Sequence, residues 1–335
     1  MPELAGRVAD AFEGQVREQE ERWLSPLAVR SYETRGRLRP DDDCRLRTPF
    51  QRDRDRILHS KPFRRLKGKT QVFIDPAGDH YRTRMTHTLE TTGIARGAAR
   101  ALRLNEDLVE AIGLGHDMGH TPSGHAGEEA LDAALQERFG QSFRHNEQSL
   151  RIAESLNLTE EVRDGILTHT GQREPATLEG KIVRIVDRVA YINHDIDDAL
   201  RAGILSPSDL PEDEIELLGP TGSQRIDTLV RDIVDHSTVA DEIRQGNEVG
   251  GAMLRLRKFM FDRVYLGPEA RREHGRVERT MHGLFEHYVA NPAEVPSRDP
   301  TAGDLQRVTD YIAGMTDRFC IAKFTELTIP EESRF

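Results

Sequence analysis

The chain has 335 residues, two cysteines and a formal net charge of −11. This length suffices for one large domain or two, and the acidic balance argues against nucleic acid or an anionic membrane as the main partner. Two cysteines make neither a disulfide framework nor a thiolate zinc site. No signal-like segment opens the chain, and no apolar run approaches the roughly 18 residues of a membrane span, so we expect a cytoplasmic protein.

The N-terminal part of the chain divides into a polar segment and a basic island. Residues 1–46 are polar and helix-prone, and we interpret them as an arm that packs on its own domain or on a neighbour. Between Arg52 and Lys69 the sequence contains eight Lys or Arg residues and only two Asp residues. Such a run is either a solvated face or a place where a polyphosphate is held, and both interpretations stay open here.

A short hairpin and two helices come next. Residues 70–74 are β-like and residues 75–79 are typical of a turn. A helix is expected over 82–104, where His87 shares a face with apolar residues seven and eleven positions later. Asn105 is a suitable N-cap for the following helix.

Several side chains that could bind a metal or act in catalysis lie close together at the end of that second helix. Three histidines and a carboxylate fall within ten residues, as His116, Asp117, His120 and His125. His116 continues the helix's apolar stripe and should point inward, while glycine and proline then end the helix. A single inward histidine is more often a hydrogen-bonded core residue. An adjacent His–Asp pair followed by two more histidines instead favours a metal or catalytic site.

The rest of the chain is helical in pattern. A helix carries His145, and the long helix over 178–200 places Asp187 on an apolar face, where a carboxylate is costly unless it is paired or binds a metal. Residues 206–223 are typical of a loop. Further helices are predicted over 223–236, 250–266, 277–289 and 303–320. We therefore predict an all-α fold with roughly a dozen helices on pattern counting and one small β-hairpin.

Four of these residues form a plausible ligand set. His87, His116, Asp117 and Asp187 offer two nitrogens and two oxygens, which suits Mn²⁺, Fe²⁺, Mg²⁺ or Zn²⁺ and leaves positions open for water and substrate. The spacing of His116 and His120 also matches a zinc-peptidase motif, but that motif needs a helix that continues past the glycine and proline found here.

The order of these ligands resembles the HD-domain phosphohydrolases, and more closely the deoxynucleoside triphosphate triphosphohydrolases of the dGTPase-like kind. The resemblance extends from about residue 47 to residue 320. It rests on several segments together: Arg52–Ile57, Phe63–Leu66, Lys69–Phe73, Arg82–His87, Gly115–Pro122, Phe143–Ser149, Asp187 with Tyr191 and His194–Asp195, and Tyr311–Phe319.

The resemblance implies hydrolysis of a dNTP at the α-phosphorus, releasing deoxynucleoside and inorganic triphosphate. It implies one divalent ion, Mn²⁺ or Mg²⁺ before Fe²⁺, Ni²⁺ or Zn²⁺, held by His87, His116, Asp117 and Asp187. The catalytic residues implied are His120, His125, Glu128 and His145, and the substrate-binding residues are Arg64, Lys69, Arg84, Tyr191 and Asp195. The expected division is an arm (1–46), an HD-type core (47–205) and a C-terminal helical region (206–335) that completes the site.

Alternatives from other classes remain. Another HD phosphohydrolase, acting on nucleoside monophosphates or signalling nucleotides, is the main one, and a nucleotide sensor without activity is a second. The resemblance also implies a homo-oligomer, with residues 206–335 as a candidate interface and a second nucleotide as a candidate activator.

Overall fold

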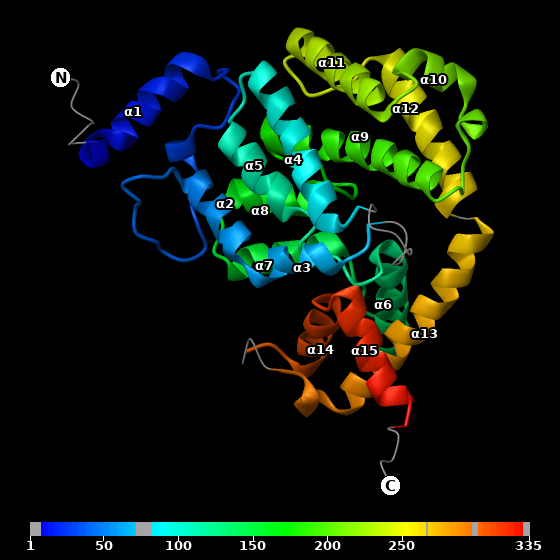
Figure 1. Ribbon diagram of the computed structural model, residues 1–335. Coiled ribbons are helices and arrows are strands. Elements are labelled where there is room, and N and C mark those ends of the chain that lie inside the picture. The colour runs from blue at the N-terminus through cyan, green and yellow to red at the C-terminus, as the bar shows by residue number, and fades with distance from the viewer. Residues whose placement is uncertain (1–7, 72–81, 266, 297–300, 331–335) are drawn as a thin grey trace, which may run out of the picture.

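The chain was analysed as a computed structural model that describes residues 8–71, 82–265, 267–296 and 301–330 (Figure 1). Within these ranges there are fifteen α-helices and no β-strand, which confirms the all-α prediction. The strand residues 72–74 and the turn 75–79 of the expected hairpin lie outside the described ranges. On either side of them, Thr70 and Thr83 form an isolated antiparallel bridge. No helix in the described part of the chain is long and apolar enough to cross a membrane.

In chain order the helices are α1 (Val8–Trp23), α2 (Pro49–His59), α3 (Lys61–Arg65), α4 (Arg84–Ala101), α5 (Glu106–Gly115), α6 (Gly124–Phe139), α7 (His145–Ser155), α8 (Glu160–Thr168), α9 (Leu178–Arg201), α10 (Glu212–Leu218), α11 (Gly222–Ala240), α12 (Asn247–Met260), α13 (Pro268–Ala290), α14 (Asp304–Ala313) and α15 (Asp317–Thr328).

The larger hydrophobic core forms around α5. Helices α4 and α9 pack on each other and on α5, α2 and α8 also pack on α5, and α11 and α12 cover α9 (Figure 1). Helix α5 starts where Asn105 accepts hydrogen bonds from two backbone N–H groups, and its apolar side chains Leu108 and Ile112 are fully buried. The same core includes Leu229 and Leu256, from the region beyond residue 206 that we expected to be a separate part. That division stays a prediction.

A second core lies below the first in Figure 1 and joins distant parts of the chain. Helix α6 packs against α13, whose other neighbours are α14 and α15. The Asp317 carboxylate, at the start of α15, accepts hydrogen bonds from the backbone N–H groups of Ser123 (2.8 Å) and Thr70 (2.8 Å). The start of α6, which carries His125 and Glu128, is therefore held by the C-terminal helices.

Three local expectations need correction. The predicted loop 206–223 contains α10, because three acidic residues favour its first turn and Leu218 is fully buried. The helix expected over 303–320 is instead two helices. Helix α14 ends, and the Thr316 hydroxyl caps the start of a new helix, α15. The sequence also predicts Thr159 as the N-cap of the helix that ends near His169. Thr159 does precede α8, but its hydroxyl donates to Asp53 (2.6 Å) instead of accepting a bond from the helix.

Candidate active site

The four predicted metal ligands converge between α4, α5 and α9. The ligand atoms of His87, His116 and Asp117 lie within 4.8 Å of one another. Asp187, in the middle of α9, places Oδ1 at 3.1 Å from His87 Nε2 and 3.5 Å from His116 Nε2. The packing of α9 on α4 thus brings together His87 and Asp187, which are 100 residues apart in the sequence.

The protonation pattern of His116 suits a bound cation. Its Nδ1–H donates to the carbonyl of Gly113 (2.6 Å), so in the neutral ring the buried Nε2 carries a lone pair. Within the described part of the chain this atom has no hydrogen-bond partner. Carboxylate oxygens of Asp117 and Asp187 each lie 3.5 Å from that nitrogen. Burial lowers the pKa of His116, but the two carboxylates outweigh it and raise the pKa to about 9. Acceptors that converge in this way need either a proton or a metal ion, and the set of donor atoms fits a divalent metal.

Arg84, the first residue of α4, presents unused donors beside this centre. Its side chain is buried, and one Nη1–H donates to Asp117 Oδ2 at 2.8 Å. The Nε and Nη2 groups are buried and have no hydrogen-bond partner among the described residues. Burial raises the pKa of Asp117, but the charges of His116, His120 and Arg84 hold that pKa well below its usual value. Asp117 is therefore anionic, and Arg84 keeps donors for another anion.

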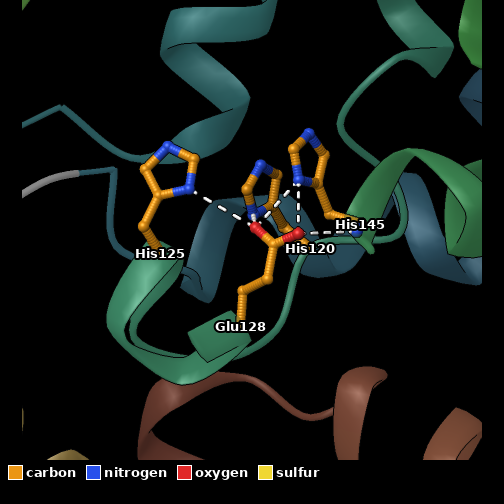
Figure 2. A group of neighbouring side chains, drawn as sticks. All are labelled: His120, His125, Glu128 and His145. Atoms are coloured by element: carbon orange, nitrogen blue, oxygen red, sulfur yellow. Dashed lines mark hydrogen bonds and ion pairs between the residues drawn. The ribbon is translucent and has the colours of Figure 1, made fainter. Parts of the chain in front are cut away.

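A second cluster, the His–Glu cluster of His120, His125, Glu128 and His145, lies beside the metal ligands (Figure 2). Glu128 accepts from the backbone N–H of His145 (2.8 Å) and from its ring Nδ1 (2.9 Å), and its Oε2 lies 3.4 Å from His125 Nδ1. Burial raises the pKa of Glu128, but the contacts with His125 and His145 reverse this and hold the pKa well below its usual range. The carboxylate is anionic, and it orients both imidazoles through its contacts with their Nδ1 atoms.

The histidines of this cluster differ in exposure. His120 is buried, stacks on His145 with ring centroids 3.8 Å apart, and places Nε2 3.3 Å from Asp117 Oδ1. Burial, together with the charges of Arg84 and His145, lowers the pKa of His120 well below its ordinary value, so this ring is neutral at neutral pH. The His125 side chain is 51% exposed, and its ring centroid is 6.2 Å from that of Tyr191. His125 is the member that a ligand can reach.

A glycine allows the two clusters to meet. A Cβ added to Gly119 would lie 2.3 Å from the backbone nitrogen of Ser149 and 2.4 Å from the carbonyl oxygen of His145. The Gly119 N–H also donates to Ser149 Oγ at 2.8 Å. Only a residue without a side chain lets the loop that carries His120 lie directly against the first turn of α7.

The remaining predicted substrate residues occupy different environments. Tyr191 and Asp195 lie one turn apart on α9, and burial raises the pKa of the Asp195 carboxyl well above its ordinary value. Tyr265 donates a hydrogen bond to Asp195. Lys69 is buried and donates to the backbone carbonyls of His120 and Ala313, while Arg64 is exposed and donates to backbone carbonyls of its own helical turn. The substrate roles of these residues stay predictions.

Comparison with known proteins gives the chain a family. Residues 84–192 match the HD domain, and residues 243–326 match the phosphohydrolase-associated domain. Proteins named deoxyguanosinetriphosphate triphosphohydrolase-like protein are 51% identical in Caldanaerobacter subterraneus subsp. tengcongensis (93% of this chain, 94% of that one) and 47% identical in Clostridium perfringens strain 13 (92% and 95%). A protein of the same name in Desulfatibacillum aliphaticivorans is 43% identical (92% and 95%).

The chain belongs to this family. The expected resemblance is confirmed, and the chain is an HD-domain phosphohydrolase. The HD-domain match spans the segment from Arg84 to just beyond Tyr191, and therefore contains all four predicted metal ligands and the whole His–Glu cluster.

One histidine of the site, His169, was not singled out from the sequence, and His194 was named only within the segment His194–Asp195 that carries the resemblance. His169 follows α8, donates its Nδ1–H to the Ile166 carbonyl (2.7 Å) and places Nε2 3.3 Å from His145 Nε2. Its imidazole belongs to a third group of potential ligands with Asp117 and His145. His194 places Nδ1 3.2 Å from His87 Nδ1. The usable signal for His169 was its place at the end of an apolar helix, the same place that His116 occupies after α5.

Proposed function

We propose that this phosphohydrolase hydrolyses deoxynucleoside triphosphates to deoxynucleoside and inorganic triphosphate, by water attack at the α-phosphorus. The names of relatives that are 43–51% identical over more than 90% of the chain support a nucleoside triphosphate as substrate. The observation that carries the proposal is the position of Asp117. Its carboxylate faces a metal-ligand histidine, the buried Arg84 guanidinium and a histidine of the His–Glu cluster.

The proposed ligands of one divalent ion are His87, His116, Asp117 and Asp187. Mn²⁺ or Mg²⁺ fits two carboxylates and two imidazoles, and Fe²⁺, Ni²⁺ or Zn²⁺ fits the same atoms. When bound, such an ion neutralises charge on a phosphate oxygen and supplies an acidified water. The chain's own contribution is to bind the Nδ1–H of His116 at the Gly113 carbonyl, so that Nε2 is the nitrogen that faces the ion.

Arg84 and α9 are proposed to hold the substrate. The unpaired Nε and Nη2 groups of Arg84 can donate to phosphate oxygens, and charge-assisted bonds of this kind contribute about 1.5–3 kcal/mol each. Tyr191 and Asp195, one turn apart on the same helix, are proposed to contact the sugar. Arg64 and Lys69 stay in the proposal as further phosphate contacts on the strength of the family resemblance.

The leaving group is proposed to take its proton from His125. Hydrolysis forms a bond from the water oxygen to the α-phosphorus and breaks the bond to the 5′-oxygen, which needs a proton to leave as an alcohol. His125 is the exposed histidine of the cluster, and its Nδ1 lies 3.4 Å from Glu128 Oε2, which orients the ring. His120 is neutral and His145 is directed at Glu128 and His169, so these two rings are proposed to position the cluster.

The experiment is turnover in ¹⁸O-labelled water with each of the four dNTPs and with a nucleoside monophosphate. Triphosphate that carries the label, together with unlabelled deoxynucleoside, supports the proposal. Label that appears only in monophosphate or pyrophosphate favours an HD phosphohydrolase of another substrate class. A homo-oligomer and an activating second nucleotide remain predictions from the resemblance, and sedimentation with and without added dNTP tests both.

A further inference from the structure

A chain of side-chain contacts reaches His87 at Nδ1, the ring nitrogen away from the proposed metal position. The other side chains of this chain take no part in the proposed reaction. His87 Nδ1 lies 3.2 Å from His194 Nδ1, and the two rings meet edge to face at 89° with centroids 5.4 Å apart. His194 Nε2 lies 3.3 Å from Glu90 Oε2. Arg82 Nε donates to the same Glu90 oxygen at 2.9 Å. The chain of contacts runs from Arg82 on the surface to the buried imidazole of His87.

With a cation at the proposed metal position, one direction of proton donation along this chain suits both of its ends. Glu90 is an acceptor only, so the facing nitrogen of His194, Nε2, carries the proton. In a neutral imidazole the other nitrogen is then a lone pair, so His194 Nδ1 accepts. His87 must therefore donate from Nδ1, which leaves its Nε2 as the lone pair. That nitrogen is the one 3.1 Å from Asp187 Oδ1, at the proposed metal position.

The opposite arrangement competes with metal binding, because His87 Nε2–H would then donate to Asp187 Oδ1 at 3.1 Å. If His87 carried its proton on Nε2, Nδ1 would need a proton from His194 Nδ1. His194 Nε2 would then present a lone pair to the Glu90 carboxylate.

We propose that His194 and Glu90 are positioning residues that fix the tautomer and ring orientation of His87 for metal binding. This inference rests on the proposed function, since it takes His87 as a metal ligand. His116 obtains the same tautomer from a backbone carbonyl near the end of α5, at Gly113. His87 lies inside α4, where the backbone carbonyls bond within the helix, so the orienting acceptor comes from a side chain on α9.

The test compares substitutions at His194 that differ in acceptor ability. His194→Asn keeps an oxygen near the position of Nδ1, whereas His194→Leu keeps a similar volume without an acceptor. We expect His194→Leu to weaken Mn²⁺ or Zn²⁺ binding about 10–100-fold in a chelator competition, and His194→Asn to restore most of the affinity. His287→Leu is the matched control, because His287 pairs with a carboxylate, Glu294, outside the proposed site.

A second readout reports the tautomer directly. In ¹⁵N-histidine-labelled, zinc-loaded protein, His87 should show a protonated Nδ1 and a metal-bound Nε2. Glu90→Gln, at a side chain that is 43% exposed, should weaken metal binding and mix the two tautomers of His194, because an amide can donate as well as accept. This variant keeps the inference testable if His194→Leu does not fold.

The possible outcomes distinguish a failure of the positioning role from a failure of the proposed metal site. Wild-type metal affinity in both His194→Leu and Glu90→Gln would overturn the positioning role while leaving the metal site intact. Wild-type affinity in His87→Ala would instead overturn the proposed ligand set. Reduced metal affinity in His194→Leu, with recovery in His194→Asn, supports the positioning role of His194, because a purely space-filling role would favour leucine over asparagine.

Discussion

The two clusters of the site use similar side chains in opposite ways. In the predicted metal-ligand set, Asp187 Oδ1 faces the Nε2 atoms of His87 (3.1 Å) and His116 (3.5 Å), and no donor in the described part of the chain bonds to His116 Nε2. In the His–Glu cluster, Glu128 accepts from His145 and faces His125, so its charge is satisfied within the cluster.

This difference separates two kinds of chemistry. A set of convergent lone pairs gains most from a cation, whereas a carboxylate that binds imidazole N–H groups holds protons in place. Exposure follows the same division, because His116 is fully buried while half of the His125 side chain is exposed. Removing one residue from each set should therefore give two different defects.

The largest effect is expected at Asp187. Asp187→Ala removes an oxygen ligand from the metal set and should abolish both stoichiometric metal and turnover. Elemental analysis of the purified protein measures the first, and triphosphate release measures the second. Asp227→Ala, at an exposed carboxylate on α11, is the control that should retain both. Full metal content in Asp187→Ala would show that the ligand assignment is wrong.

His125→Ala should give the complementary defect. General acid catalysis is typically worth about 10²–10⁴-fold, so turnover should fall by that factor while metal content and dNTP binding stay close to wild type. His236→Ala is a matched control, since His236 is about as exposed and also pairs with a carboxylate. A loss of metal in His125→Ala would remove the distinction between the two clusters.

Arg84→Ala is expected to act on binding more than on chemistry. Loss of charge-assisted bonds to phosphate costs about 1.5–3 kcal/mol, so KM for a dNTP should rise roughly tenfold to a hundredfold. Inhibition by the free deoxynucleoside should change less. Lys69→Ala tests the weaker prediction, because the Lys69 ammonium already binds two backbone carbonyls. An unchanged KM in both variants would return the basic island to a structural role.

The smallest effect concerns His169, which belongs to neither proposed set. Burial, with the charges of His116 and His145, lowers the pKa of His169 to about 4. Between the unfolded value near 6.5 and this value the unfolded chain binds the extra proton, so stability falls as pH drops through that window. His169→Gln should remove up to about 1.4 kcal/mol per pH unit of that slope in urea titrations of metal-free protein. An unaltered dependence of stability on pH in His169→Gln would contradict the lowered pKa of His169 in the folded protein.

Much of the site was predictable because its residues are marked locally. His116 and Asp117 are adjacent at the end of an apolar helix, and Asp187 interrupts an apolar stripe on α9. The α5 N-cap, Asn105, was also predictable, since capping depends on residues within one turn. The existence of α10 was missed because its acidic, proline-flanked sequence has the composition of a loop.

By itself the sequence determined the helical periodicity, the helix ends and the order of the potential ligands, because each depends on neighbours within a few residues. The tertiary structure decided which distant groups face each other. The pairing of His87 with His194 and of His145 with His169 depends on how α4, α7, α8 and α9 pack. An imidazole offers either nitrogen as donor or acceptor, and only the groups that face it in space decide which one carries the proton.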